Sequence, residues 1–89
     1  MTTDGGYSEV ADEQLDTLEQ GPDMDPFNAA LDACKLVFQA TSMARARSTA
    51  VIAEHGIVFR LPVVGHPPYT VFWAQTPDGP RIEAAFPHP

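Results

Sequence analysis

The chain has 89 residues, a formal net charge of −7 and one cysteine, Cys34. This length fits a single small domain, and a single cysteine excludes an internal disulfide framework. The acidic balance argues against direct nucleic-acid binding, and no apolar run approaches the ~20 residues that a membrane helix needs. The start of the chain lacks the features of a secretory signal, so we expect a cytoplasmic protein without membrane contact.

Residues 1–24 are predicted to form an acidic flexible arm with one short amphipathic helix. Ser8 suits an N-cap, and the helix is expected over residues 9–20 with Leu15 and Leu18 on its apolar stripe. A helix of this length is marginal alone, so the stripe needs a surface in this chain, a second copy or a partner, and Leu15 and Leu18 are candidate interface residues. The same segment carries the acidic residues considered for partner binding: Glu9, Asp12, Glu13, Asp16 and Glu19.

Residues 25–89 are predicted to form a small α+β domain that begins with helices. Asp25 and Pro26 suit an N-cap and the first helical position. The spacings 4, 3 and 4 predict a helix over 26–40, with the stripe Phe27, Leu31, Cys34 and Phe38. Small side chains continue to Gly56, which favours a second helix over 43–55. One helix over 26–55 is the alternative.

Three β-type runs follow, at 57–64, 69–75 and 81–86. They are rich in aromatic and β-branched residues, which favour strands. Pro77, Asp78 and Gly79 predict a hairpin turn between the second and third runs. The simplest arrangement is a three-stranded antiparallel meander.

The middle run is apolar on both faces. Tyr69, Val71 and Trp73 alternate with residues that include Phe72. If helices cover one face of the sheet, either Tyr69, Val71 and Trp73 or Phe72 with its neighbours points away from them. Exposed aromatic side chains of this kind indicate an interface. The alternative is that the N-terminal helix covers the face.

No catalytic residue, metal site or cofactor motif is predicted. Cys34 lies on an apolar helical stripe, where a cysteine behaves as a small inert hydrophobe. The spacing of Cys34, His55, His66 and His88 matches no local zinc pattern. No glycine-rich phosphate loop precedes a helix. We therefore expect a protein that is not an enzyme and binds no cofactor.

These features indicate a non-enzymatic protein–protein interaction module. One form of the hypothesis is a small acidic inhibitor or regulator, of phage or mobile-element type, that blocks a basic nucleic-acid-binding partner. A simpler interpretation of the acidic arm is that its charges only keep the protein soluble. The alternative function is a structural or assembly subunit of a homo-oligomer such as a homodimer, because so small a domain gains stability by association.

Overall fold

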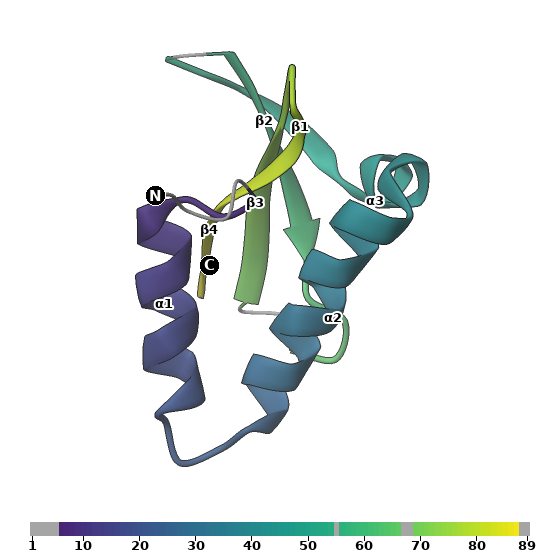
Figure 1. The fold of residues 1–89 in the computed structure, drawn as a ribbon. Coiled ribbons are helices and arrows are strands. Elements are labelled where there is room, and N and C mark those ends of the chain that lie inside the picture. Colours follow the sequence, from purple (N-terminus) through teal and green to yellow (C-terminus); the bar gives the residue numbers. More distant parts are fainter. Residues whose placement is uncertain (1–5, 55, 67–68, 88–89) are drawn as a thin grey trace.

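A computed structural model describes residues 6–54, 56–66 and 69–87 of the chain. In this part the order of elements is α1 (Glu9–Glu19), α2 (Asp25–Gln39), α3 (Thr41–Arg47), β1 (Thr49–Ala53), β2 (Gly56–Pro62), β3 (Tyr69–Thr76) and β4 (Gly79–Pro87). The fold class is α+β, as predicted. The helices lie on one face of an antiparallel sheet (Figure 1). None of the helices described is long and apolar enough to span a bilayer.

Helix α1 matches the predicted helix over 9–20. The Ser8 hydroxyl oxygen accepts a hydrogen bond from the backbone N–H of Ala11 at 3.0 Å, which is the expected N-cap. Ala11 and Leu15 are buried, so the apolar stripe of the helix packs inside this chain. Residues 1–5 of the predicted arm lie outside the described residues.

Helix α2 also agrees with its prediction, apart from its first turn and its buried face. The N-cap position is Met24 rather than Asp25. The Asp23 carboxylate instead accepts a hydrogen bond from the backbone N–H of Asp25 at 3.0 Å. The fully buried side chains are Ala30, Cys34 and Val37, whereas Phe38 is exposed and its ring packs against that of Tyr7. The buried stripe is therefore rotated from the predicted one, with Cys34 common to both.

The predicted helix over 43–55 is wrong in its second half. Helix α3 ends at Arg47, and Thr49–Ala53 form strand β1, so the sheet has four strands instead of three. The small residues favour a helix locally, but Val51 and Ile52 are β-branched and suit a strand. They pair with Val58 and Ile57 of β2. The cross-strand pairing outweighs the weak local preference.

The strands lie in the order β1-β2-β3-β4, so the predicted meander is confirmed with one strand added. Two cross-strand rows face the helices and form the centre of the core. The first row is Phe59, Trp73 and Ile82, and the second is Leu61, Val71 and Ala85. The predicted turn is present, because Thr76 pairs with Gly79 across Pro77 and Asp78.

The outer edge of β4 is covered by the N-terminal segment. The backbone N–H of Ser8 donates to the carbonyl of Ile82 at 2.8 Å, and the N–H of Ile82 donates to the carbonyl of Gly6 at 2.7 Å. Further along the edge, the N–H of Ala85 donates to the Gln14 side-chain oxygen at 2.7 Å. Helix α1 thus both packs on the sheet and satisfies one of its edges.

Candidate interaction surface

The aromatic face expected to be exposed belongs to the core. Val71 and Trp73 are fully buried beneath the helices, and Tyr69 is half-buried against the core. The Trp73 ring lies 4.6 Å from that of Phe59, and its Nε1–H donates to the Ser48 hydroxyl at 3.0 Å. Val71 and Trp73 therefore offer no exposed surface in this structure, and Tyr69 exposes only part of its side chain. Helix α2 packs on β3 here, whereas the alternative interpretation gave this role to the N-terminal helix, α1, which packs on β4.

Phe72 lies on the other face of β3 and is half-buried. Its cross-strand neighbours there are Arg60 of β2 and Ala84 of β4, which are also half-buried. This face therefore places Phe72 beside a charged side chain and does not form a continuous exposed aromatic surface. Leu15 and Leu18, the other two predicted interface residues, face the core, with Leu15 buried and Leu18 half-buried.

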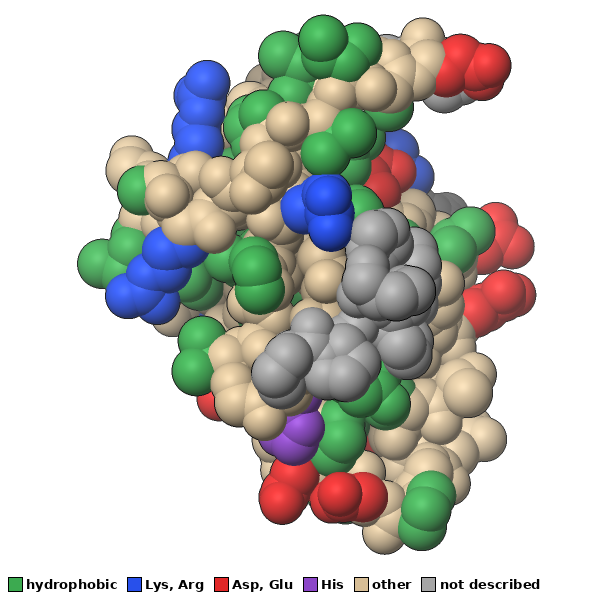
Figure 2. Space-filling model, turned by 180° about the vertical axis from the view of Figure 1, so that it is seen from behind, with side chains coloured by type: hydrophobic (Ala, Val, Ile, Leu, Met, Phe, Trp, Pro, Cys, Tyr) green, Lys and Arg blue, Asp and Glu red, His purple; other side chains and the backbone are tan. Residues whose placement is uncertain are grey.

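The five acidic residues considered for partner binding all lie on the exposed side of α1: Glu9, Asp12, Glu13, Asp16 and Glu19. Helix α1 packs on β4, at the opposite end of the sheet from β1. Arg45 and Arg47 lie in the last turn of α3, which packs on β2. In Figure 2, Lys and Arg side chains lie at the left of the view and also near its centre and upper right, whereas most Asp and Glu lie at its right and lower edges.

The β1–β2 hairpin is the most exposed apolar element in the described part of the chain. All five residues of β1 are exposed. Ile52 is 89% exposed and Ile57, its partner in the register, is 55% exposed. Beside them, Val51 (37% exposed) pairs with the half-buried Val58. These four residues are called the hairpin surface below.

The hairpin is attached to the helices at its base and extends away from them. At the base, Ser48 donates its hydroxyl to the Ala44 carbonyl at 2.6 Å and accepts from Trp73. The Arg45 guanidinium lies 5.3 Å from the centre of the Phe59 ring. Beyond Phe59 the strands continue to the turn before Gly56, whose φ of 133° suits a residue without a side chain. In Figure 1 this tip projects past the three helices.

Strand β1 also leaves one backbone edge open. It is the terminal strand of the sheet, and no described strand pairs with its outer side. Its residues, Thr49–Ala53, include neither a charge nor a proline, which are the usual devices that protect an edge. The sequence does carry a signal for this hairpin, which the prediction of a helix over 43–55 overlooked. Two β-branched pairs, Val51–Ile52 and Ile57–Val58, flank a short segment that ends in Gly56.

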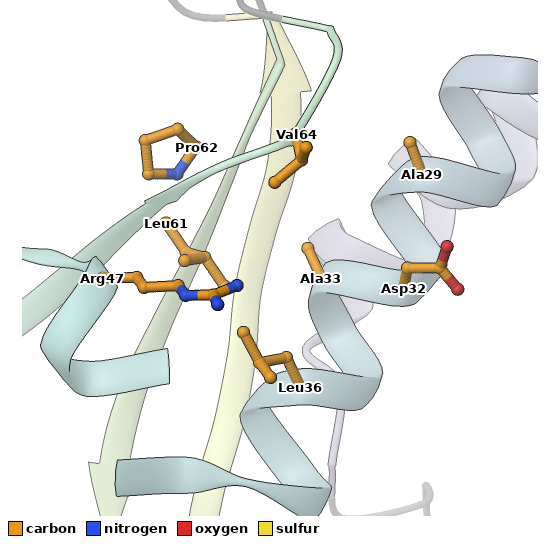
Figure 3. A pocket seen from close by; sticks show the side chains of 8 residues that line it. All are labelled: Ala29, Asp32, Ala33, Leu36, Arg47, Leu61, Pro62 and Val64. Carbon is orange, nitrogen blue, oxygen red and sulfur yellow. The ribbon is translucent and has the colours of Figure 1, made fainter. Parts of the chain in front are cut away.

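A hollow of about 470 Å³ lies between α2 and the far end of β2. Figure 3 shows Arg47 extending across Leu61 from one wall, while Asp32 projects from α2 on the other. The remaining lining is apolar and includes Val64, which is 81% exposed. Two ionic groups on opposite walls do not form a convergent polar site of the kind that binds or transforms a small molecule.

Cys34 is placed as expected for a structural residue. It is fully buried, and burial raises the pKa of its thiol to about 11, although a hydrogen bond with Tyr7 acts in the opposite direction. The thiol is therefore protonated at neutral pH and is a poor nucleophile. Among the described residues, no group of three or more His, Cys, Asp or Glu could hold a metal. His55 and His88 lie outside that part of the chain.

Comparisons with protein-family models, with curated proteins and with solved structures found no match to this chain. A function is therefore inferred from the hairpin surface, the open edge of β1 and the separation of charge.

Proposed function

We propose that this protein is a non-enzymatic protein-interaction module that binds its partner through the β1–β2 hairpin. The observation that carries the proposal is the exposure of the hairpin surface on an unprotected strand edge. Ile52 alone leaves nearly all of its side chain in water, although burying an isoleucine fully is worth about 1.5–3 kcal/mol. A partner that covers the hairpin gains this apolar contact and main-chain hydrogen bonds together.

The buried state of Cys34 supports a non-enzymatic role. Its thiol is held protonated by its surroundings, so the one cysteine of the chain serves packing. The hollow between α2 and β2 has one carboxylate, Asp32, and one guanidinium, Arg47, on opposite walls, and these do not converge as the polar groups of a catalytic pocket do.

The acidic side of α1 supports a more specific form of the proposal. Its five exposed carboxylates would favour a basic partner, such as a nucleic-acid-binding protein that this chain inhibits or regulates. No described Lys or Arg lies within ion-pair distance of them, so their charge faces solvent. Association driven by these charges weakens as salt screens them.

The hairpin proposal is tested by capture on the immobilised protein from nuclease-treated lysate, comparing wild type with Ile52→Lys. The matched control is Val64→Lys, which adds the same charge at a similarly exposed aliphatic residue away from the hairpin tip. We expect the partner to be retained by wild type and by the control and lost by Ile52→Lys. Equal retention by all three proteins would overturn the hairpin as the docking element.

The acidic form of the proposal is tested with the same captured partner at low and high salt. The variant Glu13→Gln/Asp16→Asn/Glu19→Gln removes three exposed charges without touching the buried face of α1. A basic partner is expected to be released at high salt and to bind this variant more weakly at low salt. Binding that is indifferent to both changes would contradict a role for the acidic helix.

A further inference from the structure

We propose that the open edge of β1 pairs with β1 of a second copy of this chain, antiparallel and centred on Val51, so that two four-stranded sheets become one. The inference rests on the proposed function and deepens it by naming the occupant of the hairpin. The resulting contact is isologous, since each copy uses the same strand, and it closes after two chains.

Alternation of backbone groups along antiparallel strands identifies the amides that face the open edge. Just beyond β2, the N–H of Val63 donates to the carbonyl of Tyr69 in β3 at 3.1 Å. Because backbone groups alternate in direction along a strand, those of Val58, an odd number of residues before Val63, point towards β1. Val51 pairs with Val58, so the backbone groups of its neighbours Ala50 and Ile52 point away from β2. In the proposed register, Ala50 lies opposite the partner's Ile52, and these outward groups bond to each other.

This register also makes the side chains self-complementary. It is the one that overlaps all of Thr49–Ala53 with its copy. On one face it builds a row from Val58 and Val51 to the partner's Val51 and the partner's Val58. On the other face it places Ile52, already paired with Ile57, beside the partner's Ala50. Apolar cross-strand pairs of this kind stabilise a sheet.

The charges flanking β1 suit an antiparallel copy. Arg47 precedes the strand and Glu54 follows it, and both are exposed. In the proposed register, Ser48 lies opposite the partner's Glu54, so the end of each β1 that follows Arg47 lies beside the acidic end of the other. The Arg47 side chain extends towards α2 and alternation places the two charges on different faces, so they attract at a distance and do not form a direct ion pair. The acidic α1 helices lie on β4, the edge farthest from the contact, so their mutual repulsion is small.

The two edges of the sheet favour a strand as the occupant. The chain covers its β4 edge with Gly6, Ser8 and Gln14, but leaves the uncharged β1 edge open. An edge of this composition templates the addition of another strand. The strand that matches its length, side-chain pattern and flanking charges is β1 itself.

The register is read by cysteine cross-linking of Val51→Cys, Ala50→Cys and Ile52→Cys under oxidised glutathione, with wild type as the control for buried Cys34. In the proposed register the two Val51 Cα atoms lie about 4.5 Å apart, within reach of a disulfide. The Ala50 positions of the two copies are offset along the strands by about 7 Å, and the Ile52 positions likewise. We expect Val51→Cys to form a covalent dimer and the other three proteins to stay monomeric on a non-reducing gel.

Absence of cross-linking by Val51→Cys, or equal cross-linking by all three variants, would overturn the proposal, and preferential cross-linking at position 50 or 52 would overturn its register.

Charge reversal gives a second test of the dimer. Arg47→Glu should weaken the dimer by up to about threefold, because it reverses a charge at the end of the strand that lies beside the partner's Glu54. Arg47→Glu/Glu54→Arg should restore it, and a failure to restore contradicts this attraction between the strand ends.

The outcomes separate this inference from the proposed function. If the protein stays monomeric while Ile52→Lys still abolishes capture of a different protein, the second copy is wrong and the hairpin remains the docking element. If the protein stays monomeric and Ile52→Lys changes no capture, both proposals fail.

Discussion

At the scale of single residues, Trp73 and Ser48 join the core to the base of the hairpin. The indole Nε1–H of Trp73 donates to the Ser48 hydroxyl, which itself donates to the Ala44 carbonyl in the middle of α3. The sequence could not place Trp73, because both faces of its strand are apolar and alternation alone does not say which face meets the helices. The helix packing decides the question and buries it.

Replacing Ser48 with Ala should lower the free energy of unfolding by about 1–3 kcal/mol, because the buried indole N–H loses its acceptor. Ser48→Thr keeps a hydroxyl at the same place and should lose less. Urea unfolding followed by Trp73 fluorescence measures both variants. A Ser48→Ala variant as stable as wild type would show that the bond contributes nothing net.

Cys34 should make the protein less stable at alkaline pH. Its thiol has a pKa raised from 9.0 to about 11 in the folded state, mainly by burial. The folded state holds the proton more tightly, so the stability from this group is complete below pH 9.0 and is lost as pH rises towards 11. The expected loss is about 1–3 kcal/mol.

The measurement is the free energy of unfolding at about pH 8 and at about pH 10.5–11, on either side of the unfolded-state pKa, for wild type and for Cys34→Ala. The variant is less stable throughout because it leaves a small cavity, but it should lack the alkaline loss that the thiol causes. Parallel pH profiles for the two proteins would contradict the assignment of that loss to Cys34.

At the scale of elements, helices α1 and α2 could be predicted from local signals, whereas the signal for β1 was weaker than the helical one beside it. Ser8 as a cap and the periodic apolar residues of α2 are local signals that the structure retains. The segment from Met43 to Ala53 is rich in alanine, so its local signal is helical. Its second part, Thr49–Ala53, forms a strand because β2 offers it a pairing edge, and such pairing depends on the rest of the fold.

Helix α1 contributes to the sheet through Gln14, which accepts a hydrogen bond from the Ala85 N–H on the β4 edge. Gln14→Met keeps the length of the side chain and removes the acceptor. The free energy of unfolding should fall by about 0.5–1.5 kcal/mol, and the Ala85 amide should exchange with solvent faster. Glu13→Gln, an exposed neighbour, is the matched control, and unchanged exchange at Ala85 would refute this role of α1.

At the scale of the whole molecule, the sheet has one covered edge beside an acidic helix and one open edge beside arginines. Composition predicted an acidic interaction module. The apolar pattern of the middle β-type run then directed attention to Tyr69, Val71 and Trp73 instead of the hairpin. The exposed surface exists because the β1–β2 hairpin extends beyond the helices. The relative reach of strands and helices in the fold cannot be read from a sequence pattern. Ile52 and Ile57 therefore became visible as a surface only in the folded chain.

The hairpin surface is proposed to mediate association, and sedimentation equilibrium tests this most directly. Wild type, Ile52→Lys and the control Val64→Lys are compared from low to high micromolar concentration. We predict that the mean mass of wild type and of Val64→Lys rises from that of one chain towards that of two, while Ile52→Lys stays monomeric. A wild-type protein that remains monomeric throughout, or an Ile52→Lys variant that associates as wild type does, would contradict this role of the hairpin.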